Sequence, residues 1–277
     1  MGFNYWFGLI VGNSRWHWAL FKDHIPLKNW HTSPLRQPQI LQLIEQKLSA
    51  QAWQQIEPQL QLPPFAASVS ASPCPEIWIA SVVEAQTAFL QEIPTIHIVK
   101  SAQLPLTGSY ATLGLDRILN LWGASQRYGW PVLVVDAGTA LTLTAGDNNQ
   151  ILGGMILPGL TLQARALSTK IVALPEINFH HLDSFPPRWA MSTVEAIQSG
   201  ILYTTLTGLE DHLRDWWHQY PTSPVVFTGG DGELLYRCYQ HRRDKQRTPM
   251  GDTEVRLDTN LMFWGLRAYR KLEISVS

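Results

Sequence analysis

The chain has 277 residues, of which 45% are hydrophobic and 16% charged, and its formal net charge is -1. This composition excludes a disordered chain, and the balanced charge argues against a nucleic-acid or anionic-membrane partner. Two cysteines and the lack of an apolar run of membrane-spanning length predict a cytoplasmic protein without a membrane segment.

The first predicted elements are two strands, residues 7–11 and 16–21, joined by a break at Gly12-Asn13-Ser14. A Gln-rich segment follows over residues 38–61. Its Ile and Leu residues keep helical spacing, which predicts a single amphipathic helix.

The second half of the sequence repeats this opening pattern. The other predicted elements are strands over residues 77–83, 96–99, 131–137, 141–144 and 225–227, and helices over residues 115–128, 192–203, 206–217 and 261–272. The turn Gly138-Thr139-Ala140 lies between two strands, as Gly12-Asn13-Ser14 does. This weak internal duplication predicts two similar α/β halves with a cleft between them.

The two small-residue turns are the first candidates for chemistry, because the chain contains neither a P-loop nor a Rossmann glycine motif. Bare backbone N–H groups can approach a phosphate closely, and Ser or Thr hydroxyls add donors. Each turn alone is more often a plain hairpin. Two such turns facing each other would be able to grip one polyphosphate.

Two acidic positions have both a structural and a functional interpretation. Asp136 ends an apolar strand, where it either caps its own turn or binds a cation at a phosphate site. Asp116 begins a helix, where it either complements the helix dipole or accepts the proton of an attacking hydroxyl. Arg117 is then either a surface residue or a clasp for a carboxylate. Residues 228–232 would either admit an adenine ring or form a simple turn.

Three histidines, His17, His24 and His31, recur at a spacing of seven residues. They have no cysteine or acidic partners at the spacing of metal ligands, and the sequence therefore predicts no zinc site.

Several motifs, in this order, resemble the type III pantothenate kinases, which include the Bvg accessory factors and belong to the acetate and sugar kinase, heat-shock chaperone and actin superfamily. The resemblance extends from about residue 8 to about residue 270. Its motifs are Ile79-Ala80-Ser81-Val82-Val83, Gly114-Leu115-Asp116-Arg117 with Tyr110 upstream, Val135 to Thr142, Gly153 to Gly159, Ser192 to Gly200, Phe227-Thr228-Gly229-Gly230, and Asp258 to Leu266.

This resemblance implies two ribonuclease-H-like, actin-like ATPase halves, each a mixed sheet flanked by helices, around a cleft. The halves would be residues 1–115 and 116–277. It also implies a kinase that phosphorylates pantothenate with ATP, the first step of coenzyme A biosynthesis. The expected cofactors are a divalent cation, magnesium or similar, and a monovalent cation, potassium or ammonium. The expected assembly is a homodimer.

The resemblance assigns roles by position. Asp116 would be the catalytic base. Pantothenate would contact Tyr110, Gly114, Leu115, Asp116, Arg117 and Thr193. The ATP phosphates would be held by Gly12, Asn13, Ser14, Arg15 and Thr139, and Asp136 would bind the monovalent cation.

The chain departs from the family at Ile10, where the first phosphate motif has an aspartate. The alternative is therefore a member with weakened catalysis that acts as a regulatory or binding protein. A kinase of the same superfamily acting on a sugar or acetate is a third interpretation.

Overall fold

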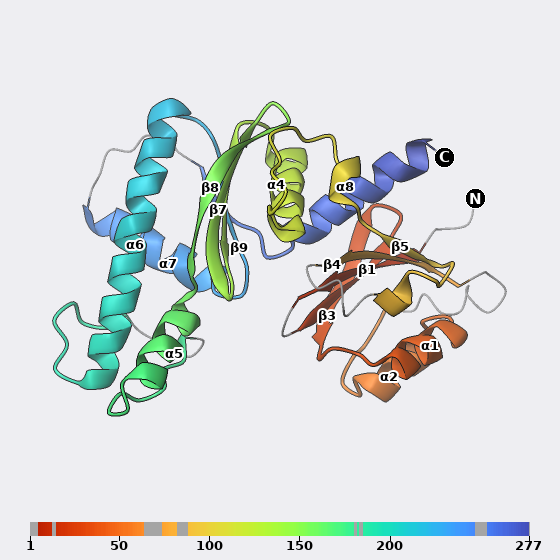
Figure 1. Cartoon of the computed structure of the whole chain (residues 1–277), viewed down its shortest axis with the longest axis horizontal. Helices are drawn as coiled ribbons and strands as arrows, with labels where there is room; N and C mark the ends of the chain where they lie inside the picture. The colour runs from red at the N-terminus through yellow and green to blue at the C-terminus, as the bar shows by residue number, and fades with distance from the viewer. Residues whose placement is uncertain are drawn as a thin grey trace. The chain divides into compact units, whose positions relative to one another are not determined.

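The computed structural model describes residues 5–12, 15–63, 74–81, 88–179, 182, 185–246 and 254–276. The chain forms two compact units that alternate along the sequence. The first unit comprises Met1–Pro105, Thr112–Gly123 and Met262–Ser277, and the second comprises Leu106–Ala111 and Ala124–Leu261. Each unit contains one five-stranded sheet with helices packed beside it (Figure 1).

The sheet of the first unit has the strand order β3-β2-β1-β4-β5. Its strands are β1 (Tyr5–Val11), β2 (Trp16–Lys22), β3 (Ile25–Thr32), β4 (Glu76–Ser81) and β5 (Ile96–Ile98). β1, β2 and β3 form an antiparallel meander, whereas β4 is parallel to both β1 and β5. The predicted strands at 7–11 and 16–21 are confirmed, and β3 is a strand that sequence reasoning missed.

The core of this unit lies between one face of the sheet and two helices, α1 (Gln37–Glu45) and α2 (Ala50–Ile56) (Figure 1). Side chains alternate between the faces of a strand, and Trp16 and Trp18 of β2 both point into this core. The indole of Trp18 lies 4.8 Å from that of Trp53 in α2, edge to face. Aromatic packing therefore fixes which face of β1 and β2 is covered by α1 and α2.

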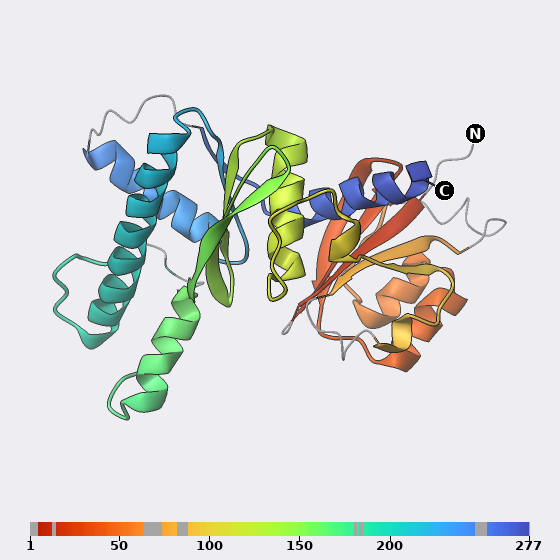
Figure 2. The ribbon, with the colours of Figure 1, turned by 45° about the horizontal axis from the view of Figure 1, so that its top comes forward.

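The C-terminal helix α8 (Leu261–Val276) covers the opposite face of the same sheet (Figure 2). The ring of Phe263 lies 6.4 Å from that of Phe21. A Cβ at Gly8 would lie 3.0 Å from Leu266 Cδ2, so a glycine in β1 allows this close packing. The predicted closing helix is confirmed and extends four residues further.

The prediction of a single helix over residues 38–61 is wrong. α1 and α2 are separated by Lys47 and Leu48, whose φ angles are +53° and +56°. This left-handed pair turns the chain and buries the Leu48 side chain completely. Ser49 then caps α2, because its hydroxyl accepts a hydrogen bond from the Ala52 N–H at 3.2 Å.

The sheet of the second unit has the order β10-β9-β6-β7-β8. Its strands are β6 (Val132–Ala137), β7 (Ala140–Asp147), β8 (Gln150–Pro158), β9 (Val225–Thr228) and β10 (Val255–Leu257). β6, β7 and β8 are an antiparallel meander, and β9 is parallel to β6 and β10. The order and directions match those of the first sheet, which confirms the predicted duplication.

The helices of the second unit pack beside this sheet. They are α5 (Leu160–Lys170), α6 (Thr193–Gln219) and α7 (Gly232–Gln246), and α4 (Leu115–Tyr128) passes from the first unit into the second. The predicted helices at 192–203 and 206–217 are in fact one helix, α6. Its buried Leu202, Leu206, Leu209 and Leu213 continue a single apolar stripe, and the helix runs without a break through Gly208.

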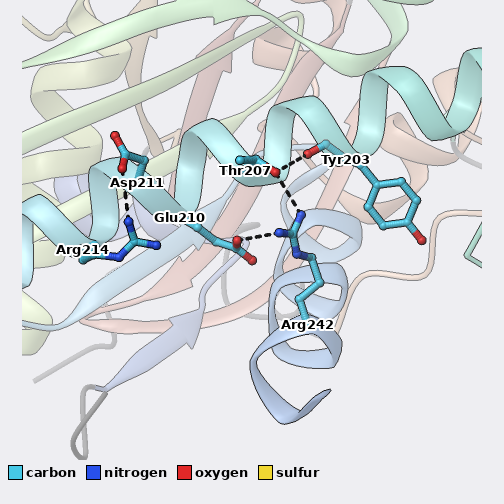
Figure 3. Close-up of polar contacts among 6 residues, drawn as sticks. All are labelled: Tyr203, Thr207, Glu210, Asp211, Arg214 and Arg242. Carbon is cyan, nitrogen blue, oxygen red and sulfur yellow. Dashed lines mark hydrogen bonds and ion pairs between the residues drawn. The ribbon is translucent and has the colours of Figure 1, made fainter. Parts of the chain in front are cut away.

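Helix α7 carries a cluster of basic residues, Arg242, Arg243 and Lys245, near its C-terminal end. Residues up to Gln246 are helical. Arg242 Nη2 lies 2.8 Å from Glu210 Oε2 of α6, and its Nη1 donates to the Thr207 hydroxyl at 3.3 Å (Figure 3). The basic cluster thus contributes to packing between two helices.

Candidate active site

The first small-residue turn lies at the carboxyl end of β1. Gly12 N–H donates a hydrogen bond to Arg15 O at 3.2 Å, which closes the turn between β1 and β2. Asn13 and Ser14, the other predicted phosphate contacts of this turn, lie outside the described residues. Arg15 is exposed to solvent beside them.

Ile10 lies in β1, two residues before Gly12, and is 8% exposed. Its direct partner on β2 is His17, and the partner of His17 on β3 is His31. Partial burial and then the charges of His31 and Arg15 lower the pKa of His17 below its ordinary value. Sequence reasoning noticed the histidine spacing but missed this pairing.

The second small-residue turn joins β6 to β7. Gly138 N–H donates to Ala140 O at 2.9 Å, and Gly159 N–H donates to Thr139 O at 2.9 Å. Thr139 is exposed at the tip of the turn, and Asp136 is half-buried at the end of β6. A Cβ at Gly159 would collide with the Gly138 and Thr139 carbonyls, so the position after β8 requires glycine.

The turn after β9 packs against the same end of β6. Gly229 has φ +88°, and a Cβ there would collide with Asp136 Oδ1 and Ala137 O. Asp231 N–H donates to Ala137 O at 2.8 Å, and Asp231 is itself buried. A glycine at position 229 therefore allows the backbone after β9 to pack close against the Asp136 carboxylate.

The predicted base and its neighbours form the start of α4. The Asp116 carboxylate accepts a hydrogen bond from the Arg117 N–H at 2.9 Å. A Cβ at Gly114 would collide with the Asp116 carboxylate, which explains the glycine in this motif. Leu115 and Asp116 are half-buried, and Arg117 is buried. The backbone thereby holds the Asp116 carboxylate in one orientation.

Two predicted pantothenate contacts, Tyr110 and Thr193, belong to the second unit. Tyr110 is exposed in the segment before α4. Thr193 begins α6, next to Ser192, whose hydroxyl accepts from the Glu195 N–H at 3.3 Å. Thr193 also lines a groove of about 520 Å³, whose other walls are Gln163, Leu167, Leu174, Ala196, Ile197, Gly200, Ile201 and Thr204.

The predicted site residues are divided between the two units. The Gly12–Arg15 turn and the Gly114–Arg117 motif belong to the first unit, while Asp136 and Thr139 flank one turn of the second. Among the described residues, no group of three or more His, Cys, Asp or Glu side chains is arranged to hold a metal ion.

Comparison with known sequences identifies the same family by two kinds of match. A family model described as type III pantothenate kinase matches residues 9–215. A type III pantothenate kinase from Nostoc sp. is 38% identical over 272 residues, covering 95% of this chain and 94% of the relative. Another from Synechococcus sp. (strain JA-3-3Ab) is 47% identical over 198 residues, covering 71% and 77%.

Solved structures resemble the chain over nearly its whole length. A conserved Campylobacter jejuni protein of the Baf family has a TM-score of 0.60 and 21% identity, covering 97% of this chain and 99% of that protein. A ROK hexokinase from Thermus thermophilus has a TM-score of 0.52 and 10% identity, covering 99% and 100%. These likenesses show a fold of the actin-like ATPase and ROK kinase type.

Proposed function

The chain belongs to the type III pantothenate kinase family, and from this membership we propose how its residues share the phosphorylation of pantothenate by ATP. The reaction is the first step of coenzyme A biosynthesis. The observation that carries this function is the match of the family model to residues 9–215. No observation favours a regulatory protein without kinase activity, or a kinase for a sugar or acetate.

Asp116 is the proposed general base toward the pantothenate hydroxyl. Its carboxylate is oriented by the Arg117 N–H, and Gly114 leaves the space that this orientation needs. Phosphoryl transfer requires mainly positioning and neutralisation of charge, with one group to accept the proton of the nucleophile. An oriented carboxylate at a helix start meets that requirement.

The proposed pantothenate contacts surround this base in the motif and extend to α6. Arg117 would clasp the pantothenate carboxylate, because a guanidinium can donate two parallel hydrogen bonds to it. The remaining proposed contacts are Tyr110, Gly114, Leu115 and Thr193.

The two small-residue turns are the proposed phosphate sites. In the first turn Gly12, Asn13, Ser14 and Arg15 would hold ATP, and in the second Thr139 would. Both turns are tight, because Gly12 N–H donates to Arg15 O and Gly138 N–H donates to Ala140 O. Tight turns of small residues let a phosphate approach the backbone closely. ATP would bring its divalent cation, which bridges the phosphates.

Asp136 is the proposed ligand of a monovalent cation, potassium or ammonium. Its carboxylate ends β6 beside the Thr139 turn and faces the bare backbone of Gly229. A cation there would offset the phosphate charge at short range.

A second copy of this chain is the proposed partner, bound through an apolar surface of the second unit. The segment before α6 exposes Trp189 (90%) and Met191 (98%), and the segment after α5 exposes Val172 (100%). The groove between α5 and α6 is lined mainly by apolar side chains. Large exposed apolar side chains are typical of interaction surfaces. Sedimentation of wild type as a monomer at micromolar concentration would refute the dimer, and Met191→Glu is expected to dissociate it.

A cytoplasmic location is also proposed, because Cys74 and Cys238 are both free thiols. Separately, none of the described helices is both long and apolar enough to cross a membrane.

The test of function is mass spectrometry of the products. With ATP, magnesium and potassium present, purified protein should convert pantothenate to 4'-phosphopantothenate and produce an equal amount of ADP. ATP consumption that is the same without pantothenate, in protein shown to be folded, would contradict the proposal.

A further inference from the structure

A row of three side chains crosses the first sheet beside the first turn. Strand pairing places Ile10 of β1 opposite His17 of β2, and His17 opposite His31 of β3. Side chains at directly opposed positions lie on the same face of a sheet. Since Trp16 and Trp18 point toward α1 and α2, the row lies on the other face.

The two imidazole rings of this row are close neighbours. Their centroids are 6.4 Å apart, their planes are inclined by 49°, and both residues are exposed to solvent. Two imidazole nitrogens bound to one metal ion, each about 2.1 Å from it, place the ring centroids roughly 5 Å apart. Small rotations of exposed side chains close that difference, so the backbone already has the spacing of a two-histidine site.

We propose that His17 and His31 together bind one divalent transition-metal ion of the class that prefers imidazole, such as Zn²⁺, Co²⁺ or Ni²⁺. Magnesium takes oxygen ligands, whereas neutral imidazole suits these softer ions. A neutral imidazole ring binds such an ion through the lone pair of one of its nitrogens. Water or a ligand oxygen completes the coordination.

The position of this metal site suggests its purpose. Ile10 lies directly beside His17, and Ile10 occupies the place where the family motif has a carboxylate. Gly12 and Arg15, which close the first turn, lie two residues beyond Ile10 and two residues before His17. The histidine pair therefore replaces the missing carboxylate as a cation ligand near the ATP phosphates. This last step rests on the proposed function, whereas the metal site itself does not.

The test is a titration of the full chain with Co²⁺ in the absence of nucleotide, followed by visible absorption and equilibrium dialysis. One ion per chain is expected. His17→Gln and His31→Gln should each weaken binding by about tenfold or more, since even outer-shell changes at metal sites cost that much. The matched control is His24→Gln, because His24 is exposed in the turn between the same two strands. This variant should bind Co²⁺ as tightly as wild type.

The proposed site is wrong if wild type binds no Co²⁺, or if Co²⁺ affinity is unchanged in both the His17 and His31 variants. It is also wrong if His24→Gln weakens Co²⁺ binding equally, or if the same residues bind inorganic phosphate in place of Co²⁺. Circular dichroism checks the fold of each variant. Pantothenate turnover is measured on the same samples with magnesium, so loss of the metal site and loss of the kinase function are distinguished.

Discussion

Arg270 Nη2 lies 3.0 Å from Glu76 Oε2, joining the C-terminal helix α8 to strand β4 across 194 positions of sequence. The guanidinium carbon of Arg270 also lies 4.9 Å from the centroid of the Trp6 ring. Trp78 Nε1 donates to the same Glu76 oxygen at 2.9 Å. One buried arginine thus ties α8 to two neighbouring strands of the first sheet.

Replacing Arg270 should destabilise the first unit. Arg270→Met keeps most of the apolar stem but leaves Glu76 without its cation, and we expect a loss of roughly 1–3 kcal/mol of unfolding free energy. Thermal melting followed by circular dichroism measures it. A melting temperature unchanged from wild type would show that this ion pair does not stabilise the unit.

The Glu76 carboxylate makes the stability of the first unit depend on pH. Burial by itself raises the pKa of Glu76, but hydrogen bonds from Trp78 and Arg270 and the Arg270 charge outweigh it, so the pKa lies below its ordinary value. The stabilisation is therefore full above about pH 4.5 and is lost as pH falls through the lowered pKa. Glu76→Gln should be less stable at pH 7 and should lose less stability than wild type between about pH 5 and about pH 3. Parallel melting curves for both proteins over this range would contradict the assignment.

Two ion pairs that involve α6 allow a matched comparison: Arg242 of α7 with Glu210, and Arg214 with Asp211 (Figure 3). The side chains of Arg242 and Glu210 are only 12% and 16% exposed, whereas those of Arg214 and Asp211 are 68% and 76% exposed. Arg242→Ala should cost roughly 1–3 kcal/mol, because the half-buried Glu210 would lose its ion-pair partner. Arg214→Ala should change stability by less than about 0.5 kcal/mol. Equal effects in thermal melting would show that burial does not decide the contribution of these pairs.

Much of the fold follows from periodicity and turns. The strands on either side of each small-residue turn were predicted because runs of β-prone residues flank Gly and Ser or Thr. The strand β3 was missed because Pro26, Lys28 and Asn29 make it read as a polar loop. It forms because its backbone pairs with β2, which is a tertiary effect.

Two helix predictions were wrong in opposite ways: one predicted helix is two, and two predicted helices are one. Residues 38–61 keep helical spacing, and nothing in the sequence shows that Lys47 and Leu48 adopt positive φ angles. α6 was divided in two at residues 204–205, although Thr there is tolerated inside a helix whose apolar stripe continues.

The candidate site was predicted residue by residue only through the resemblance, and its roles stay predictions. The structure adds the reason for some glycines, since Gly114 and Gly229 approach carboxylates that a Cβ would displace. The His17 and His31 pairing had a signal that sequence reasoning did not use. Two histidines placed symmetrically about a turn face each other when the turn joins antiparallel strands.

The assignment of Asp116 as the base predicts that some variants change mainly kcat and another changes mainly KM. Asp116→Asn should lower kcat by about 10²- to 10⁴-fold, the usual range for a lost general base, with ATP binding close to wild type. Gly114→Ala should lower kcat as well, because its Cβ would displace the Asp116 carboxylate. Arg117→Ala should mainly raise the KM for pantothenate, since its clasp forms in the ground state too. Steady-state kinetics with each substrate varied would measure this, and wild-type turnover by Asp116→Asn would remove the assignment.

The cation assignment predicts higher activity in potassium or ammonium than in sodium. Asp136→Ala should abolish that preference, because the proposed carboxylate ligand beside the Thr139 turn would be removed. Gly229→Ala should weaken it, since the added Cβ would collide with Asp136 Oδ1. Initial rates in the three chloride salts at equal ionic strength measure the preference. Equal rates in potassium and sodium, with Asp136→Ala harmless, would exclude a monovalent cation at this position.

Ile10 predicts an active enzyme with a high KM for ATP. Ile cannot coordinate a cation, but magnesium is held largely by phosphates and water, so one missing carboxylate weakens binding without abolishing it. Ile10→Asp should therefore lower the KM for magnesium-ATP while changing kcat less, and it should tighten Mn²⁺ binding because an oxygen ligand would then lie beside His17. The same variant should melt at a lower temperature, because position 10 is only 8% exposed and a carboxylate there loses hydration. ATP titrations across magnesium concentrations measure the first effect for both proteins. If wild type shows no turnover at saturating ATP and Ile10→Asp gains it, the isoleucine marks a regulatory protein, and the kinase proposal fails for this chain.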